Sequence, residues 1–354
     1  MMKRFAIRPE FLSAILSVLV LVVGSLLIRA KLQDPPIMQD DLILTAEEQR
    51  ALPAHVMPVV LLQRPWNDQL SLPYLMLQLI LSRSGENYAL GYGETVMDTK
   101  GSLQHISASK SLSAANPTGL TVGLYGAVDS LGPGVHRIPT PVDGGLLGLR
   151  FSCVNVKHLG RFKAVRDVQD LRVYLAVQAR GMSDVRVLTG SGLPTYESSG
   201  SAYLNLLDQA RVDYLPRGLA NLEEECGPGA DQAGYANIAI DPYLFIAYPN
   251  AFVFGIHPDN TRLKAALERG LARVMADGSQ QRLLQQRFFT PWLKHNLRLP
   301  ERRLLVLSTA ATEALLKESP PSAWLVPWSR MPKADAPAAS AALLCTEAFF
   351  APLC

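Results

Sequence analysis

A stretch of uncharged, mostly apolar residues near the N-terminus constrains this chain more than any other feature. Residues 11–28, FLSAILSVLVLVVGSLLI, contain no charged side chain, and Lys3, Arg4 and Arg8 precede them. As an α-helix this stretch would rise about 27 Å, which approaches the thickness of a bilayer core, whereas a signal-peptide core usually has about 7–15 residues. The length therefore favours a membrane anchor.

The same stretch leaves a second interpretation open, an export signal that is removed. Cleavage after Ala30 would satisfy the small-residue rule only loosely, because Arg29 and Lys31 flank it. In both interpretations the preceding basic residues favour a cytoplasmic N-terminus, so the remaining chain lies outside the cytoplasm. No later stretch reaches about 18 uncharged apolar residues, so the sequence predicts one span and a large body.

The composition of the body is that of a globular protein without a signal for nucleic-acid binding. Hydrophobic residues make up 48% of the 354 residues and charged residues 18%, which argues against disordered, collagen-like and coiled-coil classes. The net charge is only +3 and no dense lysine and arginine block occurs, so we expect no nucleic-acid partner. The four cysteines show no Cys-x-x-Cys spacing, which leaves small paired bridges open.

Apolar runs that alternate with helical patterns predict an α/β body. Residues 31–55 are typical of a linker, and the apolar run 56–62 predicts a buried strand. A helix should follow, because Pro73 suits a first turn and apolar residues then repeat at helical spacing up to Gly85. The same patterns predict strands over 145–156, 171–177, 211–215 and 243–256, and helices from 183, from 201, over 261–275 and over 279–288.

Three further segments lack a clear pattern. The boundaries of elements in 86–135 stay open, and residues 218–236 are predicted to form an acidic, glycine-rich loop. The tail 316–354 is rich in proline and alanine and is predicted to be poorly ordered. Cys345 and Cys354 lie close enough in the sequence to pair locally, and such a bridge would stabilise little.

Several motifs resemble, in their order and spacing, the bacterial periplasmic solute-binding proteins of the polar amino acid type. The motifs are RIPTPVDGGLLGLR (137–150), GMSD (181–184), YLNLLDQARVDYLPRG (203–218), YPNAFVFGI (248–256) and GLARVMADGSQQRLL (270–284). The resemblance covers roughly residues 50–310 and is to a divergent, family 3-like branch of transporter substrate-binding domains. It implies the two-lobed type 2 periplasmic binding fold, in which two α/β lobes joined by two crossing strands close on a small solute.

The resemblance also implies where the lobes begin and end. The two crossings would be about Leu147–Val154 and Phe245–Ile256. The chain then divides into a signal peptide or anchor (1–30), a linker (31–55), lobe 1 (56–147 and 252–315), lobe 2 (148–251) and the tail (316–354).

The chain departs from the amino-acid-binding members of that family at two places. Those proteins hold the ligand carboxylate with an arginine in a Thr-x-x-x-Arg context, which does not occur near residues 124–131, where the nearest arginine is Arg137. They place an acidic residue after a strand where this chain has Pro216-Arg217-Gly218, and Arg217 would repel an ammonium group. The resemblance therefore supports the fold more than it supports amino-acid binding.

Three arginines are candidates for contact with an anionic solute. Arg137, Arg150 and Arg217 could together clamp an anion, because guanidinium offers a planar and permanently charged fork for carboxylate or phosphate. The alternative for each is an ion pair with a local carboxylate or a position in solvent.

Other candidates are polar or aromatic residues at expected strand and helix ends. Ser183 and its neighbouring amides could bind an anion at a helix N-terminus, with ordinary helix capping as the alternative. Trp66 follows the first strand and could stack on a solute, with packing in the core or on the surface as the alternative. Asp98, Asp129 and Asp241 are candidate partners for a cation, although loop aspartates commonly form turns.

The sequence offers little for catalysis or for a cofactor. None of the six histidines lies at i, i+4 from another, so we expect no metal site. Neither a Gly-x-Ser-x-Gly elbow nor a Walker-type loop occurs. Cys153 is interpreted as a buried small hydrophobe rather than a nucleophile. We therefore expect no enzyme and no cofactor.

The expected function is that of a solute-binding protein on the periplasmic side of the cell envelope. It would close on a small polar or anionic solute by hinge motion and serve an inner-membrane permease or a sensor, without catalysis. The alternative is a membrane-anchored sensory or scaffolding domain of the same fold that has lost small-molecule binding, a reading motivated by the missing ligand contacts. Residues 11–28 would anchor the protein in the inner membrane, unless cleavage near Ala30 releases it.

Overall fold

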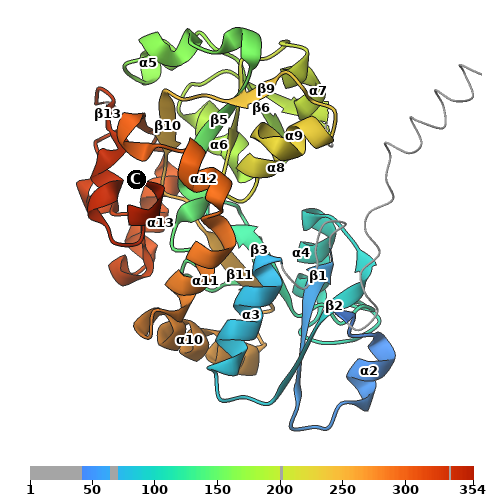
Figure 1. The fold of residues 1–354 in the computed structure, drawn as a ribbon. Helices are drawn as coiled ribbons and strands as arrows, with labels where there is room; N and C mark the ends of the chain where they lie inside the picture. The colour runs from blue at the N-terminus through green and yellow to red at the C-terminus, as the bar shows by residue number, and fades with distance from the viewer. Residues whose placement is uncertain (1–41, 64–70, 200–201, 335) are drawn as a thin grey trace, which may run out of the picture.

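The computed structural model describes residues 42–63, 71–199, 202–334 and 336–354. It contains two β-sheets, each accompanied by helices, which form two lobes that lie one above the other in Figure 1. The predicted anchor at residues 11–28 falls outside the described residues. Within the described part of the chain, no helix is long and apolar enough to cross a bilayer.

The first lobe is built on a five-stranded sheet with the strand order β2-β1-β3-β11-β4. β1 pairs parallel with β2 and β3, whereas β11 runs antiparallel to β3 and β4. The strands are β1 (Met57–Gln63), β2 (Tyr88–Val96), β3 (Val122–Gly126), β4 (His136–Arg137) and β11 (Phe252–Ile256). The helices are α2 (Ala46–Ala51), α3 (Leu72–Ser82), α4 (Thr99–Ala108), α10 (Thr261–Ala276) and α11 (Ser279–Phe288).

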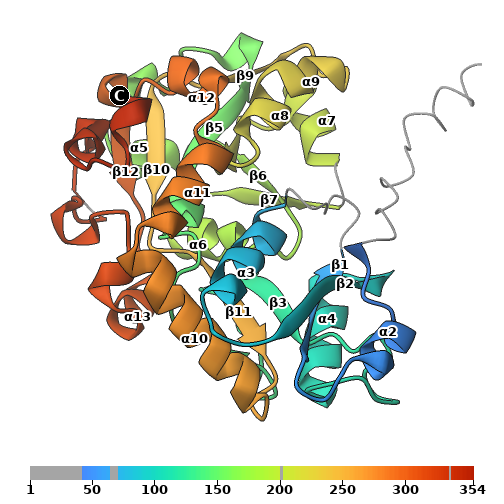
Figure 2. The same cartoon turned by 60° about the horizontal axis from the view of Figure 1, so that its bottom comes forward.

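The helix α10 illustrates how local sequence positions a whole face of this lobe. The side chain of Asn260 caps the helix by accepting from the Leu263 N–H, and six buried residues then line one face. Gly270 allows close packing on α3, because a Cβ at that position would collide with the Ile80 carbonyl. Figure 2 shows α3, α10 and α11 side by side.

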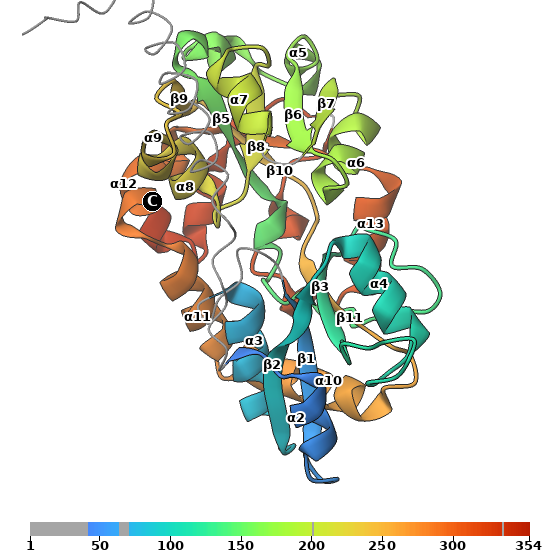
Figure 3. The same cartoon turned by 90° about the vertical axis from the view of Figure 1, so that its right-hand side faces the viewer.

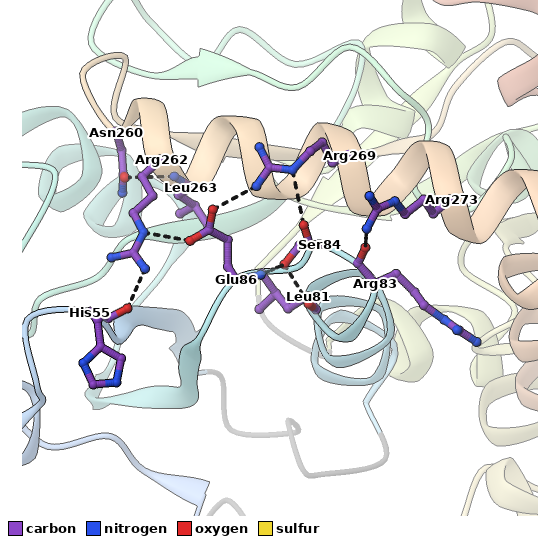
Figure 4. Close-up of polar contacts among 10 residues, drawn as sticks. All are labelled: His55, Leu81, Arg83, Ser84, Glu86, Asn260, Arg262, Leu263, Arg269 and Arg273. Carbon is purple, nitrogen blue, oxygen red and sulfur yellow. Dashed lines mark hydrogen bonds and ion pairs between the residues drawn. The ribbon is translucent and has the colours of Figure 1, made fainter.

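One carboxylate, Glu86, joins α10 to the loop between α3 and β2, as Figure 4 shows. Arg262 Nε and Arg269 Nη2 each donate to Glu86 at 2.9 Å. Further along α10, Arg273 Nη1 donates to the Arg83 carbonyl at 2.6 Å. Because these arginines lie along one side of α10, the helix is held over most of its length.

The second lobe is built on an eight-stranded sheet with the order β13-β12-β10-β5-β8-β6-β7, in which β9 also pairs with β5. All seven residues of β5 are buried, which fits a central strand. The strands are β5 (Leu149–Asn155), β6 (Ala176–Ala179), β7 (Thr195–Ser198), β8 (Tyr214–Arg217), β9 (Ile238–Ile240), β10 (Leu244–Ala247), β12 (Arg303–Val306) and β13 (Ala339–Ser340). The helices are α5 (Val168–Leu171), α6 (Ser183–Gly190), α7 (Ala202–Asp208), α8 (Leu222–Cys226), α9 (Pro228–Gln232), α12 (Pro291–Asn296) and α13 (Ala310–Glu318).

The chain passes between the two sheets at closely packed segments. A first passage, residues 138–148, leads from β4 to β5, and a second passage, residues 248–251, leads from β10 to β11. The Tyr248 N–H donates to the Gly148 carbonyl at 3.0 Å, and a Cβ at Gly148 would collide with the Tyr248 carbonyl. This arrangement confirms the predicted class, a two-lobed α/β fold with connecting passages.

A buried carboxylate links the two passages. Asp143 accepts from the N–H groups of Gly145 and Leu147 in the first passage, at 3.2 and 2.7 Å. It also accepts from the Phe252 N–H at the end of the second passage, at 3.0 Å. Burial raises the pKa of Asp143 to about 6, although these three N–H groups lower it. The two passages are therefore tied at one side chain.

Two expected boundaries differ from the structure. The segment Leu147–Val154 was expected to cross between the lobes, but β5 lies wholly in the second sheet and the crossing precedes it. The assignment of residues 252–315 to lobe 1 is wrong for β12, which pairs parallel with β10. A sequence pattern shows that a strand is buried, but it does not show which sheet the strand joins.

Three predicted segments have different secondary structure. The expected strand 171–177 begins only at Ala176, after the short helix α5. Pro216 lies within β8, opposite Ser152 of β5, rather than ending the strand. The expected loop 218–236 contains the helices α8 and α9. In this last segment three glutamates lie within α8 and a proline lies in the first turn of α9, although this composition had suggested a loop.

The expected disorder of the tail is also wrong. β13 pairs with β12, and Gln285 of α11 donates to the Phe349 carbonyl at 2.9 Å. Phe350 is fully buried, so the tail contributes to the core. The prediction of disorder relied on the proline and alanine content and did not consider the few large apolar residues that pack into the core. Cys345 and Cys354, which lie close enough in the sequence to pair locally, form a disulfide.

A second disulfide joins the central strand of the second sheet to α8. Cys153, in β5, was interpreted as a buried small hydrophobe rather than a nucleophile, and it pairs with Cys226, with a Cα–Cα distance of 5.3 Å. The residue is fully buried, as expected for a small hydrophobe. The 73-residue separation hid this partner from sequence reasoning.

Candidate functional site

The candidate site lies where the carboxyl ends of strands from both lobes meet. In open α/β sheets ligands bind outside these strand ends, at the point where the topology changes direction. β3 ends at Gly126, and α6 begins at Ser183 after β6. A Cβ at Gly126 would lie 3.0 Å from the Ser183 side chain, so the two lobes touch here. We call residues 126–129, 180–184 and 248–250 the interlobe junction; Figure 3 shows α6 facing the first lobe at this level.

A buried ion pair dominates the second-lobe side of the interlobe junction. Arg150 Nε and Nη2 donate to the two carboxylate oxygens of Asp184, at 2.5 and 3.1 Å. Tyr248 donates its hydroxyl to Asp184 and accepts from Arg150 Nε at 3.0 Å. Burial lowers the pKa of Arg150, but Asp184 and Tyr248 raise it above its ordinary value, so the guanidinium stays charged. Arg150 thus already has a carboxylate partner.

Ser183 is buried at the start of α6 and is tied to the second passage. Asn250 Nδ2 donates to its hydroxyl at 3.2 Å. Met182, and not Ser183, occupies the N-cap position of α6, and no side-chain hydrogen bond caps this helix. The alternative interpretation of Ser183 as the helix cap therefore does not apply. The structure therefore brings Ser183 and Arg150 together, through Asp184 and the residues of the second passage.

Asp129 faces this cluster from the first lobe. A Cβ at Gly126 would lie 2.8 Å from Asp129 Oδ2 and 3.0 Å from Ser183 Oγ, so the carboxylate lies beside α6. Burial raises the pKa of Asp129 to about 6; Asp184 also raises it, while Arg186 and Arg137 lower it. Its neighbours therefore include both signs of charge.

Arg137 borders the interlobe junction on the first-lobe side. Its Nη2 donates to the Asp129 carbonyl at 2.8 Å, which fixes the loop after β3. Its Nη1 lies 3.6 Å from Glu318 of α13, a more exposed carboxylate. Arg137 is the least buried of the three candidate arginines, and its partners do not enclose it.

Arg217 lies at the end of β8 in a separate polar cluster. It forms a buried ion pair with Glu225 and lies over the ring of Tyr203, 5.4 Å from the centroid. Burial raises the pKa of Glu225, whereas Arg217 lowers it. Arg217 Nε and Glu225 Oε2 are buried without a hydrogen-bond partner among the described residues. No contact among the described residues joins Arg217 to Arg137. Arg150 lies closer, because a Cβ at Gly218, the residue after Arg217, would collide with its guanidinium.

The other candidates fall outside this group. Trp66 lies outside the described residues. Asp98 caps α4 by accepting from the Gly101 N–H, and Asp241 accepts from the N–H groups of Tyr243 and Leu244 at the start of β10. Both aspartates therefore have the turn and cap contacts that were the alternative interpretation. Within the described ranges, no group of histidine, cysteine or acidic residues could hold a metal ion.

Apolar contacts also cross the interlobe junction. Ala127 and Val128, directly after β3, belong to the same buried cluster as Val187 and Leu188 of α6. Two surface hollows among the described residues lie elsewhere in the first lobe. One is lined by residues of α2, β1 and the 111–117 loop, and the other by residues of α3 and α11.

Sequence reasoning missed the acidic partners of the arginines. Asp184, the partner of Arg150, lies 34 residues away in the sequence. Glu225, the partner of Arg217, lies only 8 residues away. Asp184 was visible in the motif GMSD, and Tyr248 and Asn250 interrupt an otherwise apolar run. A polar interruption within a buried stretch was the signal that could have identified them.

Comparisons with known proteins give structural neighbours only. No family model and no curated protein match the chain. Among solved structures, it is similar to an ancestral arginine-binding protein bound to arginine, with 13% identity, a TM-score of 0.44, and coverage of 67% of this chain and 99% of that one. It is also similar to an amino acid ABC transporter substrate-binding protein from Streptococcus pneumoniae bound to L-arginine (12% identity, TM-score 0.45, coverage 66% and 94%). A third is the GluR0 ligand-binding core from Nostoc punctiforme in complex with L-glutamate (13% identity, TM-score 0.42, coverage 66% and 100%).

Proposed function

We propose that this chain is an extracytoplasmic solute-binding protein that holds a small polar or anionic solute at the interlobe junction, without catalysis. The observation that carries the proposal is the meeting of Asp129, Ser183 and Arg137 where strand ends of both lobes come together. A solute between the lobes would contact both of them, and such differential contact is what lets binding favour one arrangement. The bound form would then be read by an inner-membrane permease or a sensor.

The cysteine pairing supports a location outside the cytoplasm. All four cysteines of the chain are paired, as Cys153–Cys226 and Cys345–Cys354. Disulfides form and persist in oxidising compartments such as the periplasm and are rare in the cytosol. This agrees with export directed by residues 11–28, through an anchor that stays or a signal that is cleaved near Ala30.

The proposed ligand contacts differ in how readily they can be made. Arg137 lies at the edge of the interlobe junction with an exposed carboxylate partner, Glu318, whereas Ser183 lies within the junction and would have to share its hydroxyl with buried Asn250. Arg150 and Arg217 would have to exchange their carboxylate partners for a solute anion, which costs free energy unless the solute replaces every bond. Trp66 follows β1 in the sequence and stays in the proposal as an aromatic contact.

A thermal-shift screen of the full-length chain in mild detergent tests the proposal. The library contains amino acids, organic acids, sugars and phosphorylated metabolites. A ligand present at about 100 times its Kd should raise the free energy of unfolding by roughly 2.7 kcal/mol, which gives a clear increase in Tm. The matched variants are Arg137→Ala, which removes a proposed contact, and Arg172→Ala, which removes an exposed arginine elsewhere in lobe 2. A ligand-induced increase in Tm that is seen in the wild type and in Arg172→Ala but is lost in Arg137→Ala supports solute binding at the interlobe junction.

A second candidate function is a sensory or scaffolding domain of the same fold that has lost solute binding. Two observations favour this second function. Arg150 and Arg217 each already have a carboxylate partner within the protein, and Ala127 and Val128 make apolar contacts across the interlobe junction. Such contacts occupy space and charge that a solute would otherwise use. No shift with any compound in the screen would contradict solute binding and support this second function.

A further inference from the structure

We propose that residues 307–334 and 336–340, which we call the brace, hold the hinge between the two lobes in the arrangement described, so that the lobes separate only when the brace is released. This inference goes beyond the proposed function and does not depend on it, because it concerns the lobes without any solute. In Figures 1 and 3, α13 of the brace lies at the level where the two lobes meet.

The brace grips the first passage at two consecutive glycines. The Leu325 N–H donates to the Gly144 carbonyl at 2.8 Å. A Cβ at Gly144 would collide with the Leu325 side chain, and a Cβ at Gly145 would lie 2.6 Å from the ring of Trp324. Both glycines have positive φ angles, +61° and +90°, which other residues rarely adopt. The brace therefore packs on the positions where the passage has most backbone freedom.

Further contacts extend this grip along the first passage and into the first sheet. Ser319 donates its hydroxyl to the Pro139 carbonyl at 3.1 Å, and Glu318 lies 3.6 Å from Arg137 of β4. Val326 is buried in the same cluster as Val142 and Leu146 of the passage. These contacts connect the brace to the end of the passage that belongs to the first lobe.

Both ends of the brace are fixed to the second lobe. At its start, the Leu307 N–H donates to the Ala247 carbonyl at 2.8 Å. At its end, the Ala338 N–H donates to the Arg166 carbonyl at 2.7 Å, and β13 pairs with β12. A segment that is fixed at both ends in one lobe and packs on the hinge in between resists rotation of the other lobe.

The consequence follows from how hinges move. Domain closure and opening are absorbed by large φ and ψ changes at a few residues, and Gly144 and Gly145 are suited to such changes. Rotation at these glycines would displace Trp324 and Leu325 and break the hydrogen bond to Gly144. Local opening of the passage should therefore be suppressed while the brace is in place.

Hydrogen–deuterium exchange and an interlobe distance measurement on the full-length chain in mild detergent test the brace. The distance is measured by electron spin resonance between labels attached through unnatural amino acids at Lys100 in lobe 1 and Val173 in lobe 2, both exposed. The test variant is Trp324→Ala with Leu325→Ala. The matched control is Trp292→Ala, a partly buried tryptophan of α12 that does not contact the passage glycines.

We expect the double variant to speed amide exchange over residues 143–148 by about tenfold or more and to broaden the distance distribution, while the control changes neither. The weaker variant Glu318→Gln with Ser319→Ala should give a smaller change of the same kind, and it serves if the double variant does not fold. Wild-type exchange and distances in folded brace variants would overturn the proposal. Loss of solute binding alone would not, because neither readout uses a solute.

Discussion

Arg150 and Asp184 form a two-bond ion pair that is almost completely buried where the lobes meet. The two side chains come from β5 and from the first turn of α6, and Tyr248 of the second passage completes the group. Gly218 makes room for the guanidinium, since a Cβ there would collide with Arg150. The pair thus joins a central strand, a helix start and a passage between lobes.

Removal of one member of this pair should destabilise the protein strongly. Asp184→Ala leaves the Arg150 charge buried without its carboxylate, and breaking a buried pair in this way typically costs about 3–5 kcal/mol. Urea unfolding of the variant and of Arg180→Ala, an exposed arginine nearby, measures the difference. The control should change the free energy of unfolding by no more than about 0.5 kcal/mol. Equal small effects would show that the pair is dispensable.

The buried carboxylate Asp143 should make stability fall as the pH rises. Its pKa in the folded protein, about 6, lies above the ordinary value of 3.8, so protonation favours the folded state. This contribution is full below about pH 4 and is lost as the pH rises through 6, with a span of up to roughly 3 kcal/mol.

The comparison that isolates this effect uses Asp143→Asn, which does not titrate. Between pH 4.5 and pH 7 the free energy of unfolding of the wild type should decrease more than that of the variant. All other carboxyl groups are shared by the two proteins, so their contributions cancel in the difference. Parallel pH profiles for the two proteins would contradict a raised pKa at Asp143.

The two disulfides should differ in how much they stabilise the fold. In the chain-entropy description, a bridge across 73 residues contributes about 4 kcal/mol and a bridge across 9 residues about 3 kcal/mol. We therefore expect Cys153→Ser with Cys226→Ser to lower the urea midpoint more than Cys345→Ser with Cys354→Ser. The opposite order would indicate that burial or packing, rather than loop length, decides their contributions.

The Glu86 clamp seen in Figure 4 should contribute in a salt-dependent way. Hydrogen bonding to Arg262 lowers the pKa of Glu86, opposed by burial. Glu86→Gln removes the charge that two arginines share, and it should lower Tm at low ionic strength. The difference should shrink at about 1 M salt, where screening acts over about 3 Å. Glu268→Gln, which removes a 4.0 Å surface pair with Lys264, is the control and should change Tm less.

The sequence predicted those parts of the fold whose causes are local. β1 follows from one apolar run, and α10 and α11 follow from helical spacing with Asn260 and Gly278 before their starts. The tail could not be predicted in this way, because its order depends on a few large residues, such as Phe350, that find partners across the chain. Membership of β12 in the second sheet is equally nonlocal.

For the candidate site, the sequence predicted residue types better than it predicted partners. Ser183 and Arg150 were named as separate candidates, and the carboxylate of Asp184, which follows Ser183 and pairs with Arg150, was not anticipated. The sequence shows that a buried arginine needs an acidic partner, but only the fold shows which carboxylate that partner is. The same holds for Arg217 and Glu225, whose helix was read as a loop.

Native mass spectrometry of the full-length chain, incubated with the solute library in mild detergent, tests directly whether the protein binds a small solute. We expect a one-to-one complex with a small polar or anionic compound, which persists in Arg172→Ala and is lost or weakened in Arg137→Ala. The absence of any complex, from protein that is folded with both disulfides intact, would contradict solute binding at the interlobe junction.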